Sequence, residues 1–187
     1  IESKYNNTKE TEIFKKGELL YNYHIAKKEA RKEKNIIVVE GFMDVIRLYS
    51  VGIKNVVALM GTALTKEQIT LIKRVSNNII ISLDGDSPGK KACYNVGEAL
   101  EEAGFDVSVI TLKENLDPDE FIIKYGKEEY QKLLDNPYSY NEFKVNYLKE
   151  GKDLTKIEDQ TVYINNVLES LKNEEDEIKI ELILKKI

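Results

Sequence analysis

The sequence predicts an α/β fold in which a mostly parallel sheet is flanked by helices and is followed by a small C-terminal helical subdomain. Short unbroken runs of β-branched apolar residues, such as residues 36–39, are typical of strands buried inside a parallel sheet. These runs alternate with segments of helical spacing, and this alternation favours a parallel sheet with helices on both faces. After residue 116 only helical patterns remain.

The first half of the chain carries the predicted sheet. The helix at residues 18–33 is indicated by apolar residues at helical spacing, whereas residues 1–15 show no clear period. Thr65 and Gln68 have the spacing of a capping box, and Gly104 is a typical helix stop. The predicted strands are residues 36–39, 55–59, 78–83 and 107–112, and the predicted helices are residues 18–33, 42–50, 65–75 and 88–103.

The second half is predicted to be helical and to be divided by Pro137 and Gly151. We therefore expect three parts: an arm and helix over residues 1–34, an α/β domain over residues 35–136, and a helical subdomain over residues 137–187. The predicted helices here are residues 118–135, 138–150, 157–172 and 175–187.

Composition places the chain among globular proteins of a reducing compartment. Of its 187 residues 42% are hydrophobic and 33% are charged, and no apolar run approaches the roughly 18 residues of a membrane span. No signal peptide is visible, and the single cysteine, Cys93, excludes an internal disulfide or a cysteine-rich zinc site. We expect a cytoplasmic protein, and we give neither Cys93 nor the single histidine, His24, a catalytic role.

Charge is distributed unevenly along the chain. The net charge of −5 argues weakly against nucleic acid as a partner. Residues 1–35, however, hold nine basic and six acidic residues, whereas residues 117–187 hold eleven and seventeen. The N-terminal arm is therefore the best candidate for a basic surface, with a solvated helix face as the alternative.

Acidic residues collect where the predicted strands end. Because right-handed crossovers place the carboxyl ends of parallel strands along one edge of the sheet, we expect these side chains to lie together. They are Glu40, Asp44, Asp84, Asp86, Asp117 and Asp119.

Such a group of carboxylates is expected to bind a divalent cation. Carboxylates that lie close together repel one another unless a cation joins them, and oxygen ligands suit Mg²⁺, for which Mn²⁺ is expected to substitute. Two such ions can clamp the attacking and leaving oxygens of a phosphoryl transfer. Local alternatives remain for single residues: Asp44 could favour a helix N-terminus, Ser87 could cap the helix that contains Pro88, and Asp117 could cap the next helix.

At these positions the chain resembles the Toprim domain, a metal-binding fold shared by bacterial primases, topoisomerases and some nucleases. Its signature of a Glu followed by Asp-x-Asp is met by Glu40, Asp84 and Asp86. The amino-acid sequence of the matching segments most resembles that of DnaG-type primases, although these primases more often have Tyr at the position of Phe42 and Ala at the position of Pro88. The similarity covers roughly residues 1–145, and its segments are residues 4–7, 10–17, 39–46, 61–65, 84–92 and 117–119.

The resemblance implies the catalytic core of a primase, a DNA-directed RNA polymerase that makes short primers on single-stranded DNA from ribonucleoside triphosphates. Glu40, Asp84 and Asp86 would be catalytic, and Asp44, Asp117 and Asp119 would complete the metal ligands. The resemblance also implies that Lys4 and Lys16 bind nucleotide or DNA. Primases of this type carry a zinc module and a helicase-contacting region that this chain lacks, so we expect a monomer that primes poorly by itself.

Two other interpretations stay open. Another Toprim enzyme, of nuclease or topoisomerase type, would use the same metal site to cleave DNA, but no nucleophilic tyrosine can be singled out here. A non-catalytic module would use the acidic edge only to bind an ion or a protein.

Overall fold

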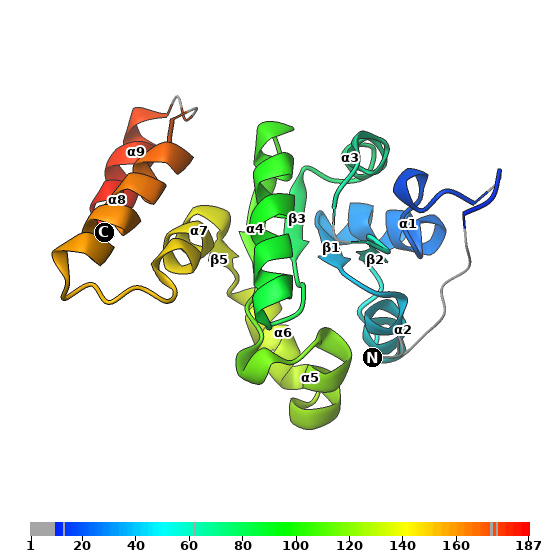
Figure 1. Ribbon diagram of the computed structural model, residues 1–187. Coiled ribbons are helices and arrows are strands. Elements are labelled where there is room, and N and C mark those ends of the chain that lie inside the picture. Colours follow the sequence, from blue (N-terminus) through cyan, green and yellow to red (C-terminus); the bar gives the residue numbers. More distant parts are fainter. Residues whose placement is uncertain (1–9, 13, 62, 173, 175) are drawn as a thin grey trace.

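A computed structural model describes residues 10–12, 14–61, 63–172, 174 and 176–187. Its centre is a five-stranded sheet with the strand order β2-β1-β3-β4-β5 (Figure 1). The first four strands are parallel, and β5 pairs with β4 in the antiparallel direction. The strands are β1 (Ile36–Val39), β2 (Val56–Ala58), β3 (Asn78–Ile81), β4 (Asp106–Val109) and β5 (Tyr138–Ser139).

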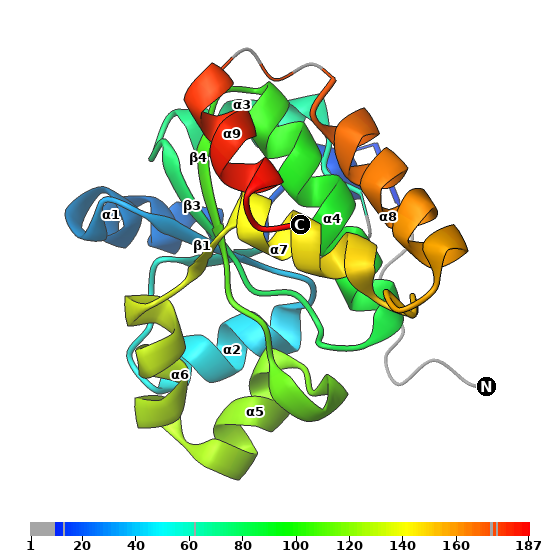
Figure 2. The same cartoon turned by 90° about the vertical axis from the view of Figure 1, so that its left-hand side faces the viewer.

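Helices cover both faces of the sheet, as the sequence predicts. Figure 2 shows α2, α5 and α6 on one side and α3, α4 and α7 on the other. The helices are α1 (Tyr23–Glu33), α2 (Phe42–Ser50), α3 (Lys66–Lys73), α4 (Ser87–Glu102), α5 (Pro118–Tyr125), α6 (Lys127–Asp135), α7 (Tyr140–Lys149), α8 (Ile157–Ser170) and α9 (Glu177–Leu184), with short 3-10 turns η1 (Lys16–Glu18) and η2 (Lys113–Asn115).

The core has two layers, one on each face of the sheet. On the first face, side chains of α1, α3, α4 and α7 pack on alternate strand residues such as Ile36 and Val38. On the second face, α2, α5 and α6 pack on the intervening residues Ile37 and Val39. Strand β1 therefore buries both of its faces, which explains why its four residues are all β-branched and apolar.

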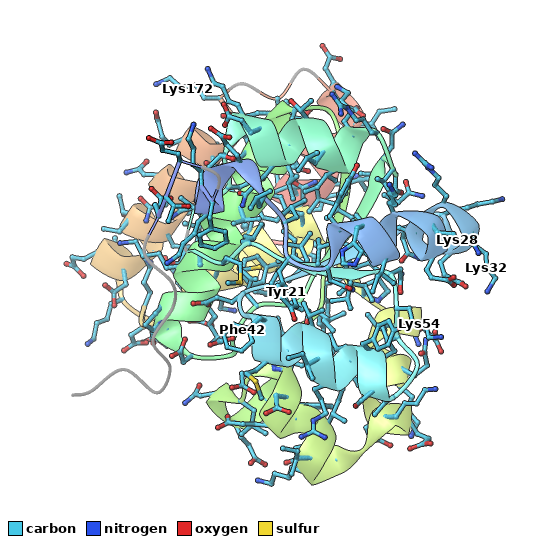
Figure 3. All side chains as sticks on the ribbon, turned by 90° about the vertical axis from the view of Figure 1, so that its right-hand side faces the viewer. Tyr21, Lys28, Lys32, Phe42, Lys54 and Lys172 are labelled. Atoms are coloured by element: carbon cyan, nitrogen blue, oxygen red, sulfur yellow. The ribbon has the colours of Figure 1, made fainter. Side chains whose placement is uncertain are left out.

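The first predicted helix begins later than expected. It starts at Tyr23, because Tyr21 forms an antiparallel bridge with Ala58 on the outer edge of β2. The Tyr21 N–H donates to the Ala58 carbonyl at 3.0 Å, and the Ala58 N–H donates to the Tyr21 carbonyl at 3.3 Å. The Tyr21 ring lies beside Phe42 of α2, with 6.2 Å between ring centroids (Figure 3). Apolar spacing alone does not distinguish this bridge from a helical turn.

Two further predictions were wrong in the second half. The helix expected at residues 118–135 breaks at Gly126, whose φ of +85° belongs to the left-handed region that favours glycine. The expectation that strands end after residue 116 fails at β5, which adds two residues to the sheet edge. Two residues are too few to show a strand pattern.

The C-terminal helices have a small core of their own, formed by Val145, Tyr163, Val167, Leu171 and Ile183. Their first helix, α7, also belongs to the main core through Tyr140 and Phe143. The part beginning at residue 137 is thus joined to the sheet by both β5 and α7.

None of the helices in the described ranges combines the length and apolar character needed to cross a membrane.

The contact between α4 and α7 yields a stability prediction. Tyr140 is fully buried, and its hydroxyl donates to the Tyr94 carbonyl at 2.6 Å. A Cβ on Gly97 would lie 2.0 Å from the Tyr140 ring, so Gly97→Ala must displace a ring that has no free space. We expect the free energy of unfolding to fall by about 3 kcal/mol, despite the higher helix propensity of alanine. Urea denaturation measures the free energy of unfolding of both proteins. Asn95→Ala, an exposed position on the same helix, is the control and is expected to change little.

Candidate metal centre

The acidic residues lie where the sequence analysis expects them, at the carboxyl ends of the parallel strands. A cleft of about 300 Å³ opens there between the end of β1, the N-terminus of α2 and the N-terminus of α5. Its lining combines backbone and apolar groups with five carboxylates. The lining residues are Glu40, Gly41, Phe42, Met43, Asp44, Met60, Gly61, Asp84, Asp117 and Asp119.

Asp84 is the most unusual of these carboxylates. It lies three residues after the end of β3, and its Oδ1 atom is buried without a hydrogen-bond partner among the described residues. Burial is the largest cause that raises the pKa of Asp84 to about 7, and the charges of Glu40, Asp44, Asp117 and Asp86 contribute to the same shift in that order. A buried acceptor surrounded by negative charge is costly unless a cation or a proton joins it.

Glu40 and Asp86 are near enough to influence each other. Burial raises the pKa of Glu40, and the Asp86 charge adds to this effect. Asp86 does not line the cleft but caps α4, where its Oδ1 accepts from the Gly89 N–H at 2.7 Å. The local alternative that gave this cap to Ser87 was wrong by one residue, since Ser87 is the first residue of the helix.

Asp44 ties α2 to the α5 N-terminus. It is only 5% exposed, and its two carboxylate oxygens accept from different backbone groups. Oδ2 accepts from the Gly41 N–H at 3.1 Å, and Oδ1 accepts from the Asp119 N–H at 3.3 Å. Burial raises the pKa of Asp44 to about 7, although both hydrogen bonds oppose this shift.

Asp117 and Asp119 lie at the start of α5. Asp117 is the N-cap, as its local alternative proposed, and its Oδ1 accepts from the Glu120 N–H at 2.7 Å. Asp117 also lines the cleft, so the capping role and a place beside the other carboxylates coexist. Asp119 forms an ion pair with Arg47 of α2.

The donor set suits a hard cation that retains water. Within the described ranges, no three His, Cys, Asp or Glu side chains converge closely enough to enclose a metal ion by themselves. Mg²⁺, however, usually takes one or two protein carboxylates and fills its remaining positions with water and substrate phosphates. The unpartnered Asp84 Oδ1 in an acidic cleft fits a cation bound in this way.

The two candidate lysines lie in the N-terminal arm. Lys4 falls outside the described residues. Lys16 opens the turn η1, where its N–H donates to Glu10 Oε1 at 3.1 Å and its carbonyl accepts from Gln68 Nε2 at 3.3 Å. Gln68 is almost fully buried and also donates to the Leu59 carbonyl, so it fixes η1 against the end of β2. The predicted capping box is confirmed, with Gln68 N–H to Thr65 Oγ1 at 3.1 Å.

His24 and Cys93, which we expect to have no catalytic role, do not line the cleft. His24 is exposed on α1. Cys93 is buried, and burial raises the pKa of its thiol, which makes the thiol inert rather than reactive.

Sequence reasoning missed two residues that shape the centre, Arg47 and Gly89. Arg47 holds Asp119, and a basic residue at that position of a helix carries no signal of its own. Gly89, like the expected Gly85, allows close backbone approach. A Cβ on Gly85 would lie 2.5 Å from the Leu112 carbonyl oxygen, and one on Gly89 would lie 2.3 Å from the Asp84 carbonyl oxygen. The spacing of these glycines around the Asp-Gly-Asp segment was the available signal.

The raised pKa of Asp84 predicts a pH-dependent stability. The unfolded chain releases the Asp84 proton near pH 4, whereas the folded protein holds it until about pH 7, so stability is lost as pH rises between these values. At 1.36 kcal/mol per pKa unit the shift corresponds to about 4 kcal/mol, and because solvent screens this partly exposed carboxylate we expect a loss of about 2 kcal/mol. We expect Asp84→Asn to raise the Tm in EDTA at pH 8 and to leave it nearly unchanged at pH 4. Thermal scans at both pH values measure it, and an equal effect at both would contradict the assignment.

Comparisons with known proteins agree with this geometry. The family model described as Toprim-like matches residues 37–122. The DNA primase of Clostridium acetobutylicum is 41% identical over 184 residues, which is 98% of this chain and 30% of the relative. The DNA primase of Staphylococcus aureus (strain COL) is 45% identical over 150 residues, 80% of this chain and 25% of the relative.

A solved structure supports the same similarity over the whole chain. It is that of a DnaG primase catalytic domain bound to single-stranded DNA, with a TM-score of 0.78 and 28% sequence identity. The match covers 100% of this chain and 61% of that chain. The chain thus spans under a third of the length of these curated relatives and over half of the solved domain.

Proposed function

The chain belongs to the Toprim-containing catalytic cores of bacterial DnaG-type primases, and from this we propose that it carries the Mg²⁺ site for RNA primer synthesis on single-stranded DNA. In this reaction the primer 3′-hydroxyl attacks the α-phosphate of a ribonucleoside triphosphate, a new P–O bond forms, and pyrophosphate leaves. Mn²⁺ is expected to substitute for Mg²⁺.

The observation that carries the proposal is the buried, unpartnered Asp84 Oδ1 in an acidic cleft at the carboxyl edge of the sheet. In this proposal Asp84 and Asp86 are the main cation ligands, and Glu40 binds the cation or accepts a proton. Asp44, Asp117 and Asp119 serve a second cation position directly or through water. A divalent cation there would neutralise phosphate charge and lower the pKa of the attacking hydroxyl.

The remaining residues bind and orient the substrate. Lys4 and Lys16 are proposed to offset phosphate charge from the N-terminal arm. Burial of Asp44 and the hydrogen bonds that it accepts keep the α5 N-terminus beside the cleft, so the carboxylates keep a fixed arrangement as substrate binds.

The organisation of the chain and its partners are also proposals. We propose an arm and helix over residues 1–34, the Toprim domain over residues 35–136 and the helical subdomain over residues 137–187. Single-stranded DNA and ribonucleoside triphosphates are the proposed substrates. Single-stranded DNA is included because the solved structure of a similar primase domain is bound to it. In such primases, we expect the zinc module and the region that contacts the replicative helicase to lie outside these 187 residues.

The experiment is a primer-synthesis assay on the complete primase that carries this chain. Labelled ribonucleotides, a single-stranded template and Mg²⁺ should yield short RNA, and EDTA should stop the synthesis. A parallel incubation with supercoiled plasmid DNA tests the nuclease or topoisomerase alternative. Metal-dependent cleavage of the plasmid without primer synthesis would overturn the proposal.

A further inference from the structure

We propose that Arg47 is a positioning residue for the cation site, because it holds the Asp119 carboxylate in a single orientation at the lining of the acidic cleft. This inference rests on the proposed function. Arg47 lies on α2, one helical turn after Asp44, and reaches across to α5. Its Nε donates to Asp119 Oδ1, and the two side chains are 37% and 17% exposed.

Asp119 is fixed at two points that both originate on α2. Its side chain is bound by Arg47, and its backbone N–H donates to Asp44 Oδ1 at 3.3 Å. Asp44 is in turn fixed by the Gly41 N–H at 3.1 Å. The two helices lie side by side, as Figure 2 shows and as their extensive packing requires. Arg47 therefore controls the direction of a carboxylate whose backbone is already anchored at the cleft.

Two physical effects of Arg47 on cation binding have opposite signs. As a positive charge near the cleft, it repels a cation, but it is partly exposed and its long-range effect is weakened by solvent. As a partner of the Asp119 carboxylate, Arg47 restricts the rotamers of that side chain in advance. Asp119 then loses less conformational freedom when a cation binds. Partners of metal ligands typically change metal affinity by roughly 10-fold to 100-fold when removed. We infer that the orienting effect is the larger one.

The test is a Mn²⁺ titration of the protein in which electron paramagnetic resonance measures the concentration of free Mn²⁺. We expect Arg47→Ala to weaken Mn²⁺ binding by about 10-fold. Arg47→Lys, which keeps the positive charge but carries its N–H donors on a single nitrogen, is expected to restore part of the affinity. A tighter Mn²⁺ affinity in Arg47→Ala would show that only charge repulsion acts, and an unchanged affinity would show that Arg47 has no role; either result overturns the inference.

Lys124→Ala is the matched control. Lys124 lies on α5 and pairs with the exposed Glu114, so its removal takes away one positive charge without touching the cleft. We expect its Mn²⁺ affinity to stay within about 2-fold of the unchanged protein. An equal weakening in this variant would overturn the positioning role.

A double-mutant cycle distinguishes positioning from a general structural effect. If Arg47 acts through Asp119, then adding Arg47→Ala to Asp119→Asn should not weaken Mn²⁺ binding further. A further 10-fold loss in the double variant, or a fall in Tm in EDTA that parallels the loss of binding, would contradict the inference. Failure of the proposed function looks different: the unchanged protein would not bind Mn²⁺, or Asp84→Asn would bind it as well.

Discussion

Replacing Asp84 by asparagine is expected to abolish both divalent-cation binding and primer synthesis while leaving the fold intact. The substitution preserves the shape of a side chain whose Oδ1 is buried without a partner, but it removes the negative charge. A bound metal supplies several kcal/mol of transition-state stabilisation, and each 1.36 kcal/mol is tenfold in rate, so the rate should fall by about 10³-fold or more.

Stability separates this loss from misfolding. Because the metal-free protein carries the Asp84 charge at a cost, Asp84→Asn should have a higher Tm than the unchanged protein in EDTA at pH 8. The control is Asp106→Asn, the same substitution at an exposed position on the opposite end of the neighbouring strand. Calorimetric Mn²⁺ titration and the primer assay measure both variants. Retained priming in Asp84→Asn would remove the basis of the metal site.

Replacing Gly89 by alanine is expected to disable the same site through the backbone. The added Cβ would lie 2.3 Å from the Asp84 carbonyl oxygen and 2.7 Å from Asp84 Cβ. These atoms belong to the segment that leads from the end of β3 into α4, and they lie too close to accept the added Cβ, so Asp84 itself must shift. A displacement of about 1 Å at a reacting centre can reduce activity by about 10²-fold, and we expect losses of that order in primer synthesis.

The unfolding free energy helps to interpret this variant. Overpacking is expected to lower it by about 1–3 kcal/mol, even though alanine favours helices more than glycine does. Lys91→Ala, an exposed position on the same helical turn, should leave both stability and Mn²⁺ affinity nearly unchanged. An increase in stability of Gly89→Ala together with normal Mn²⁺ binding would mean that the close approach to Asp84 is unimportant.

Much of the fold could be predicted because its signals are local. The β-branched run of β1 and the Thr65–Gln68 capping box depend on neighbouring residues only, and both are confirmed. Elements that depend on distant contacts were missed. β5 exists because two residues meet β4, and Tyr21 leaves the helix because it bonds to Ala58.

The same distinction applies to the site. Strand-end positions predicted which carboxylates approach one another, because the sheet edge is a property of the topology. Their individual environments could not be predicted. The lack of a partner at Asp84 Oδ1, the cap formed by Asp86 and the ion pair of Arg47 with Asp119 each require atomic positions from segments far apart in sequence.

The bridge between Tyr21 and Ala58 has a consequence for self-association. Open sheet edges invite other chains to add strands, and proteins avoid this by covering or shortening them. Here Tyr21 already uses the outward amide and carbonyl of Ala58, and Asn22 Nδ2 donates to the Val56 carbonyl at 3.0 Å. The opposite margin ends in a strand of only two residues. Within the described residues, neither margin of the sheet therefore offers a long template for strand pairing with another chain.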